Sequence, residues 1–113
     1  MHSSSKYKAG DILLIPFPYT DLSASKVRPV FVIKDSVDED LLIAPISTNL
    51  NREKHDYLIL EEDYEGKFLP VPSCLRYEKL VTLSTALIIK KVTTLKRETT
   101  QKIQRKIADF ILS

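Results

Sequence analysis

The residues best suited to chemistry lie in two short segments, Lys26–Pro29 and Ser47–Asn49. Each segment adjoins an apolar run that is typical of a buried strand. If the two strands pair in an antiparallel hairpin, the start of one lies beside the end of the other, so Arg28 approaches Ser47 and Thr48. A guanidinium held beside hydroxyl groups is a suitable receptor for phosphate, because it offers two parallel N–H donors and the hydroxyls add further hydrogen bonds.

Spacing alone does not assign Arg28 to a phosphate. The guanidinium would pair as well with a carboxylate, and Asp21 and Asp35 are the nearest acidic residues on either side of it in the sequence. The phosphate clamp and the structural ion pair are therefore equally supported at this point.

The other polar groups do not predict a metal or nucleophile site. The consecutive carboxylates Asp38–Asp40 would alternate between the faces of a strand or be solvated in a turn, so they do not converge on an ion. The acidic segment Glu61–Glu65 has the same fault. His2 and His55 have no partner visible in the sequence, and Cys74 is expected to be a small core residue. We therefore expect no metal and no cofactor.

Hydrophobic periodicity predicts the elements that must position these residues. Short apolar runs rich in β-branched residues predict strands, and the segment Glu61–Gly66 is too charged to bury and predicts a turn. Apolar residues spaced three and four apart predict an amphipathic helix from about Leu95 to Leu112. The fold class is thus mainly β (α+β), a small, strongly bent barrel with a C-terminal helix. The predicted strands are Asp11–Phe17, Val30–Ile33, Leu41–Ile46, Asp56–Leu60, Cys74–Leu83 and Leu87–Ile89.

Length and composition favour one globular domain. The chain has 113 residues, of which 43% are hydrophobic and 28% charged. We expect a flexible tail over residues 1–8 and a single domain over 9–113. The longest apolar runs are about five residues, far short of the ~20 that a bilayer requires, and the N-terminus does not have the pattern of a signal peptide. We therefore expect a cytoplasmic protein with no membrane partner.

Charge is distributed in blocks along the chain. The formal net charge of +2 is the sum of +3 over residues 1–34, −8 over 35–65, +2 over 66–87 and +5 over 88–113. Such blocks either pair within the fold or present surfaces of opposite sign. The total is too small to indicate a nucleic-acid partner by itself, but Arg28 lies in a positive block next to the acidic one.

Several motifs follow one another along the chain. An aliphatic run opens at Gly10 with Gly-Asp, and residues 16–21 read Pro-Phe-Pro-aromatic-Thr-Asp. Residues 26–33 read Lys-x-Arg-Pro-x-x-Val-Ile. In these motifs the chain closely resembles the PemK/MazF-like toxins of bacterial and archaeal toxin–antitoxin systems. Ala44–Thr48 is similar to the second block of that family, and Tyr77–Lys91 with the terminal helix is similar to the third.

This resemblance implies both a fold and a function. The fold would be an SH3-like barrel of the PemK/MazF/CcdB kind. The function would be that of a toxin endoribonuclease, a homodimer that binds single-stranded RNA near its subunit interface and cuts it without a metal, leaving a 2′,3′-cyclic phosphate and a 5′-hydroxyl. An acidic cognate antitoxin would neutralise it, and their complex would bind DNA. The alternative is a non-enzymatic CcdB-like toxin, or a binding module of this fold, that acts on a protein target.

The resemblance also assigns roles to residues. The catalytic Arg of the family corresponds to Arg28 and its hydroxyl residue to Ser47; because many relatives have Thr at that position, Thr48 is the alternative. Val81 stands where a number of members have an Arg on the third-block strand, so another basic residue would have to make that RNA contact. The expected RNA-binding residues are Tyr19, Lys26, Asn49, Arg76 and Lys79.

Overall fold

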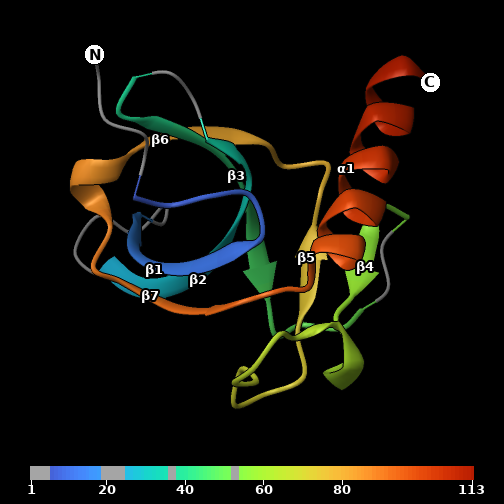
Figure 1. Cartoon of the computed structure of the whole chain (residues 1–113), viewed down its shortest axis with the longest axis horizontal. Coiled ribbons are helices and arrows are strands. Elements are labelled where there is room, and N and C mark those ends of the chain that lie inside the picture. Colours follow the sequence, from blue (N-terminus) through green and yellow to red (C-terminus); the bar gives the residue numbers. More distant parts are fainter. Residues whose placement is uncertain (1–5, 19–24, 36–37, 52–53) are drawn as a thin grey trace.

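The computed structural model describes residues 6–18, 25–35, 38–51 and 54–113. In this part of the chain, seven strands form an antiparallel sheet, and one long helix lies beside it (Figure 1). This confirms the predicted class, mainly β with a C-terminal helix. The strands are β1 (Asp11–Pro18), β2 (Ser25–Asp35), β3 (Asp40–Ser47), β4 (Asp56–Leu58), β5 (Cys74–Arg76), β6 (Val81–Ser84) and β7 (Lys90–Thr94), and the helix is α1 (Arg97–Leu112).

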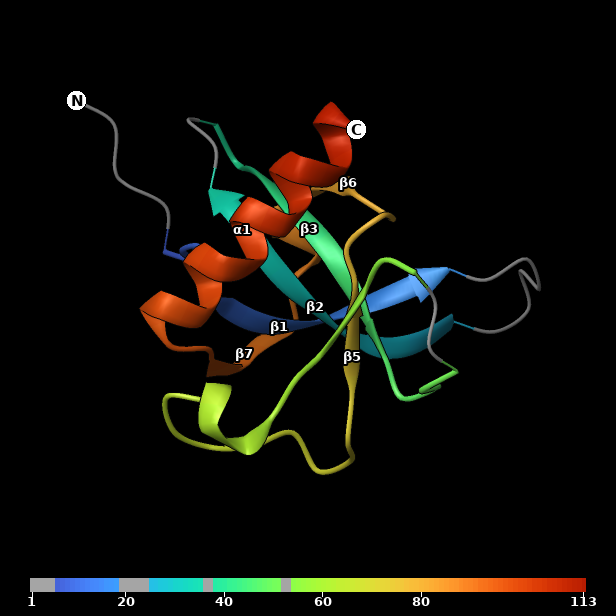
Figure 2. The same ribbon diagram turned by 90° about the vertical axis from the view of Figure 1, so that its right-hand side faces the viewer.

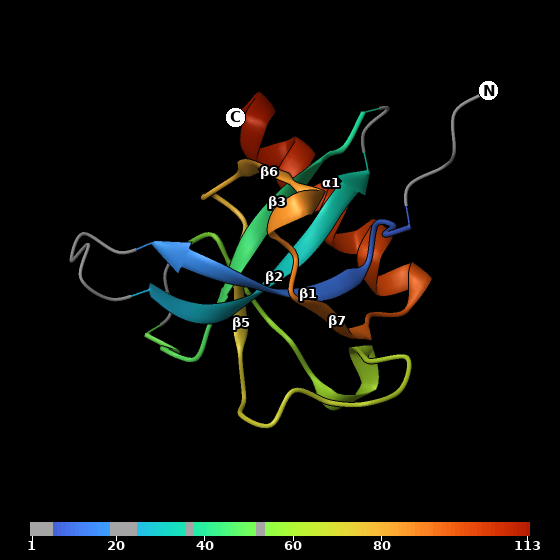
Figure 3. The same ribbon diagram turned by 90° about the vertical axis from the view of Figure 1, so that its left-hand side faces the viewer.

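The sheet is strongly bent, with β1, β2 and β3 at its centre. Its strand order is β4-β5-β3-β2-β1-β7, and β6 also pairs with β3. Within the described residues β4, β6 and β7 each pair on one side only, so the sheet does not close into a barrel. Helix α1 lies across one side of the bent sheet (Figure 2), and the opposite view shows β1 and β2 in front of the helix (Figure 3).

Each central strand contributes to two separate core clusters, because successive side chains point to opposite faces of a sheet. On β2, Phe31 and Ile33 enter the first cluster, which also contains Ile103 of α1. Val30 and Val32 enter the second cluster, which lies on the other face of the sheet. The face that carries the second cluster is called the inner face below.

Two predicted strands are corrected by the structure. The predicted strand Cys74–Leu83 is interrupted by a turn, in which the Lys79 amide donates to the Arg76 carbonyl (3.2 Å), and is therefore two strands, β5 and β6. The predicted strand Leu87–Ile89 overlaps a 3-10 helix over Thr85–Leu87; the strand is β7, whose exposed lysines suit the end of a sheet. The tail over 1–8 and the domain over 9–113 stay a prediction.

The segment Glu61–Gly66 is also not simply a solvated turn. Asp63 lies in a 3-10 helix (Glu61–Asp63) and is only 4% exposed. Its carboxylate accepts hydrogen bonds from the Leu60 amide (2.8 Å), the Tyr57 hydroxyl (3.0 Å) and the Thr99 hydroxyl (3.1 Å). Burial of this charge is possible because three donors surround it. These three hydrogen bonds connect the end of β4 to the first turn of α1.

Candidate functional site

The first part of the site lies where β2 and β3 run side by side. The two strands pair with Val30 opposite Pro45, and continuing this register by two residues places Arg28 opposite Ser47. Because side chains alternate along a strand, Arg28 and Ser47 belong to the inner face, beyond the end of the second core cluster. Both residues are partly buried. The structure therefore brings this guanidinium and this hydroxyl onto neighbouring strands and onto one face of the sheet.

The Ser47 hydroxyl is already used as an acceptor. The backbone amide of Asn49 donates to Ser47 Oγ at 3.0 Å, which is a local turn typical of serine. A hydroxyl has one proton and two lone pairs, so Ser47 keeps its proton for donation to another group. Thr48 lies just past the end of β3 and is exposed. Of the two hydroxyl residues, Ser47 is therefore the one that lies within β3, on the face that Arg28 shares, and whose side chain is held by a hydrogen bond.

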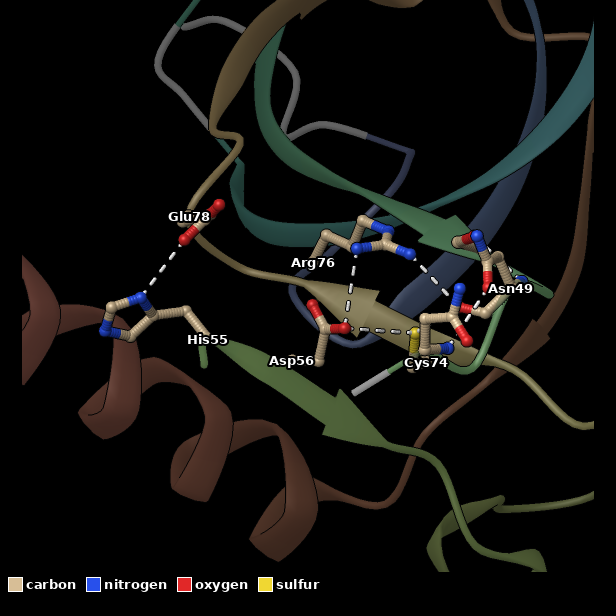
Figure 4. A network of polar contacts seen from close by, with 8 residues as sticks. Asn49, His55, Asp56, Cys74, Arg76 and Glu78 are labelled. Atoms are coloured by element: carbon tan, nitrogen blue, oxygen red, sulfur yellow. Dashed lines mark hydrogen bonds and ion pairs between the residues drawn. The ribbon is translucent and has the colours of Figure 1, made fainter. Parts of the chain in front are cut away.

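A buried ion pair lies further across the inner face (Figure 4). Arg76 on β5 stands directly opposite Asp56 on β4, and its Nη1 lies 3.4 Å from Asp56 Oδ2. The Asp56 side chain is 2% exposed and that of Arg76 is 14% exposed. The second arm of the guanidinium, Nη2, donates to the Asn49 carbonyl at 3.0 Å.

Asp56 and Cys74 are members of this site that sequence reasoning missed. Cys74 is buried, as expected of a core residue, and it pairs with Ser47 in the β3–β5 register. Its sulfur lies 3.5 Å from the Asn49 carbonyl oxygen and 3.8 Å from Asp56 Oδ2, so the thiol reaches either acceptor. A signal was present in the sequence, since Asp56 is a charged residue that opens an apolar strand run.

The remaining predicted site residues are not gathered at this point. Tyr19 lies outside the described residues, and Lys26 is placed only by its backbone on β2, opposite Phe17. Lys79 is exposed in the turn between β5 and β6, past the end of β5 that lies away from Cys74.

Of the two carboxylates that could pair with Arg28, the structure excludes Asp35. Asp35 stands at the far end of β2, opposite Leu41. Asp35 lies seven positions further along the strand than Arg28, or about 23 Å at ~3.3 Å per residue. This distance excludes a pair between the two side chains. The other alternative, Asp21, lies outside the described residues.

His55 does have partners, contrary to the sequence interpretation. Its Nδ1 lies 3.1 Å from Glu78 Oε1, and its ring packs on that of Phe110 in α1 with centroids 4.6 Å apart. The pairing of β4 with the segment that follows β5 brings these distant residues together. Burial raises the pKa of Tyr77 beside them, and the nearby carboxylates, Asp56 foremost, raise it further. This cluster attaches the helix to the sheet at the end of β5 opposite the Ser47 end.

Two further observations concern the described residues only. There, no three side chains among His, Cys, Asp and Glu are grouped so that they could hold a metal ion. No helix in the same ranges is long and apolar enough to cross a bilayer.

Comparisons with known proteins agree with this architecture. The sequence profile of the family described as "PemK-like, MazF-like toxin of type II toxin-antitoxin system" matches residues 8–111. No curated relative matches the chain by sequence.

Solved structures share the fold at low sequence identity. MazF (Form-I) from Deinococcus radiodurans has a TM-score of 0.72 at 11% identity, over 97% of this chain and 100% of that chain. The Mycobacterium tuberculosis toxin MazF-mt6 has a TM-score of 0.68 at 16% identity, over 89% of this chain and 95% of that one. An endoribonuclease from a mycobacterial species, in complex with its cognate antitoxin, has a TM-score of 0.70 at 12% identity, over 93% and 94%.

Proposed function

The chain belongs to the PemK-like, MazF-like toxins of type II toxin–antitoxin systems, and on this premise we propose that it is a metal-independent endoribonuclease that cleaves single-stranded RNA. The observation that carries the proposal is the β2–β3 register, which, continued by two residues, puts Arg28 opposite Ser47 at the end of the inner face. A guanidinium and a hydroxyl proton side by side form a receptor for a phosphodiester. A toxin that acts only by binding a protein target needs no such receptor.

These two groups would stabilise the transition state of a cleavage whose nucleophile comes from the RNA itself. The ribose 2′-oxygen attacks the adjacent phosphorus and loses its proton, the P–O5′ bond breaks, and the 5′-oxygen takes up a proton. The products are a 2′,3′-cyclic phosphate and a 5′-hydroxyl. Negative charge accumulates on the phosphoryl oxygens in the transition state, where Arg28 and the Ser47 hydroxyl donate hydrogen bonds.

Arg28 is assigned to charge stabilisation and not to proton transfer. An arginine guanidinium stays protonated in proteins, so it has no lone pair with which to accept the 2′-hydroxyl proton. Its value lies in a fixed fork of N–H donors that matches two phosphoryl oxygens. Ser47 supplies one further donor, oriented by the Asn49 amide that its oxygen accepts.

RNA contacts and protein partners complete the proposal. Tyr19, Lys26, Asn49, Arg76 and Lys79 stay proposed as RNA-binding residues. We also propose a homodimer in the cytoplasm, neutralised by an acidic antitoxin. Support comes from the family, and from two similar structures described as complexes, one of an endoribonuclease with its cognate antitoxin and one of MazE with MazF.

One assay tests the enzymatic proposal. The purified protein is incubated with a long single-stranded RNA in excess EDTA, beside the variants Arg28→Ala, Ser47→Ala and Thr48→Ala. We expect cleavage by the wild type, and losses of about 10²–10³-fold for Arg28→Ala and Ser47→Ala, because each removes a transition-state donor. Thr48→Ala is the matched control for the hydroxyl and should stay within about threefold of the wild type.

The outcomes separate the alternatives. A wild type that leaves RNA intact in EDTA and cleaves it when magnesium is added would refute metal independence. Intact RNA under both conditions would favour a toxin directed at a protein target. Cleavage that survives Arg28→Ala would refute the phosphate clamp, and a larger loss for Thr48→Ala than for Ser47→Ala would exchange the roles of the two hydroxyls.

A further inference from the structure

Asn49 is held by both of its backbone groups. Its amide N–H donates to Ser47 Oγ at 3.0 Å, and its carbonyl accepts from Arg76 Nη2 at 3.0 Å. The two groups flank the same Cα, so holding both restricts rotation at this residue. Its side-chain oxygen accepts from the Asn51 amide at 3.1 Å, which fixes the next step of the loop. These hydrogen bonds therefore fix the position of the backbone over residues 47–51.

The donors that reach the Asn49 carbonyl share one buried carboxylate. Asp56 Oδ2 lies 3.4 Å from Arg76 Nη1 and 3.8 Å from the Cys74 sulfur. The same thiol lies 3.5 Å from the Asn49 carbonyl oxygen. A guanidinium is a rigid planar fork, so fixing one arm on Asp56 also fixes where the other arm points. Figure 4 shows Arg76 between Asp56 and Asn49, with Cys74 beside both.

We propose that Asp56 is a positioning residue for RNA cleavage: it holds Arg76 and Cys74 against the Asn49 carbonyl and thereby sets the direction in which the Ser47 hydroxyl donates. This inference rests on the proposed function and names a residue that does not touch the substrate. Asp56 lies on β4, two strands away from Ser47 in the sheet order. Its effect is transmitted through Arg76 and Asn49.

The loss of Asp56 would affect catalysis by changing the direction in which the Ser47 hydroxyl donates its hydrogen bond. If the loop moves, the Asn49 amide no longer fixes the lone pair of Ser47, and the hydroxyl proton samples directions away from the phosphate. Small displacements of a catalytic group cost up to about 10²-fold in rate. Substrate binding changes less, because Asp56 itself makes no contact with the RNA and the proposed contacts of Lys26 and Lys79 are unaffected. The expected signature is a fall in kcat with little change in KM.

A purely structural ion pair makes a different prediction. If Asp56 only connects β4 to β5, its loss affects cleavage by the same factor whether or not Ser47 carries a hydroxyl. If Asp56 acts through Ser47, its loss has no further effect once that hydroxyl is gone. Residues that act as a unit are non-additive in this way, and a double-mutant cycle measures the difference.

The experiment is a cycle of Asp56→Asn, Ser47→Ala and the double variant, assayed by single-turnover RNA cleavage with enzyme in excess. We expect Asp56→Asn to lower the cleavage rate at saturation by about tenfold in the wild-type background and by less than about twofold in the Ser47→Ala background. Arg76→Lys is the second variant, in case Asp56→Asn fails to fold. It keeps a positive charge beside Asp56 and for the RNA but loses the second N–H arm. Because rates are compared at saturating enzyme, a weaker RNA contact does not affect them, and the two factors should be the same as for Asp56→Asn.

Glu78→Gln is the matched control. It removes the contact of Glu78 with His55, which also joins the β4 region to the chain just after β5 but does not involve Asn49. We expect cleavage within about twofold of the wild type, and circular dichroism melts confirm folding for each variant. Equal factors for Asp56→Asn in both backgrounds would overturn the inference and leave the proposed function intact. A wild type that does not cleave RNA would overturn both.

Discussion

Replacing Asp63 by alanine should strongly destabilise the folded protein, although this residue lies in a short acidic segment. Its carboxylate accepts hydrogen bonds from the Leu60 amide, the Tyr57 hydroxyl and the Thr99 hydroxyl, at 2.8, 3.0 and 3.1 Å. The Asp63 carbonyl also accepts from the Lys96 amide at 2.9 Å, at the start of α1. Asp63 is thus the point at which the end of β4 is attached to the helix.

The magnitude follows from the three side-chain hydrogen bonds. Bonds to a charged group contribute about 1.5–3 kcal/mol each, which gives a gross loss of roughly 4.5–9 kcal/mol for three bonds. Part of this is offset because the variant no longer buries a charge. The net decrease in the free energy of unfolding should be about 3–5 kcal/mol for Asp63→Ala. Asp63→Asn, which keeps one acceptor, should lose about 1–3 kcal/mol.

Urea unfolding followed by circular dichroism measures this directly, at one protein concentration because self-association would make the midpoint concentration-dependent. At about 4 °C per kcal/mol, Asp63→Ala should also melt roughly 12–20 °C below the wild type. Glu62→Ala is the matched control, since Glu62 is the exposed neighbour and should change stability by less than about 0.5 kcal/mol. An Asp63→Ala variant within 1 kcal/mol of the wild type would refute the role of Asp63 in attaching the helix.

Two further predictions concern alkaline stability and a close backbone approach. Burial, followed by the hydrogen bond to Asp63, raises the pKa of Tyr57 well above the ordinary value of about 10. Unfolding therefore releases its proton above about pH 10, stability falls as the pH rises through that range, and Tyr57→Phe should flatten this slope in urea titrations at about pH 9–11. Gly10 has φ 101°, and an added Cβ would lie 2.7 Å from the Thr100 hydroxyl oxygen. Gly10→Ala should lose at least about 2 kcal/mol in a thermal melt, whereas Gly66→Ala, with nothing within 4 Å, should be neutral; equal melting temperatures would contradict this reasoning.

Elements with a strong local pattern were predictable. The run Val30–Ile33 lies inside β2, and the apolar spacing that predicted a helix from about Leu95 to Leu112 matches α1 at Arg97–Leu112. The strand Lys90–Thr94 was missed because it begins with two exposed lysines and pairs only with β1 among the described strands. Its pairing, and not its hydrophobicity, makes it a strand.

The site was predictable in part, for a similar reason. Antiparallel pairing of consecutive strands indicated that Arg28 approaches Ser47, because a hairpin register depends on residues close in sequence. The roles of Asp56 and Cys74 depend on the pairing of β4 with β5 across the long connection 59–73. No local pattern sets that register.

The sequence by itself determined the residue types available for chemistry, the strands around Arg28 and Ser47, and the motifs through which the chain resembles a toxin family. The tertiary structure decided that Ser47, and not Thr48, ends β3 and accepts the Asn49 amide. It also placed Asp35 at the far end of β2 from Arg28, and it joined Asp56 to the Asn49 carbonyl through Arg76. The physical reason is the sequence separation of the residues that must meet. Periodicity reports which face of its own element a residue occupies, whereas a site is assembled from elements whose contacts form only on folding.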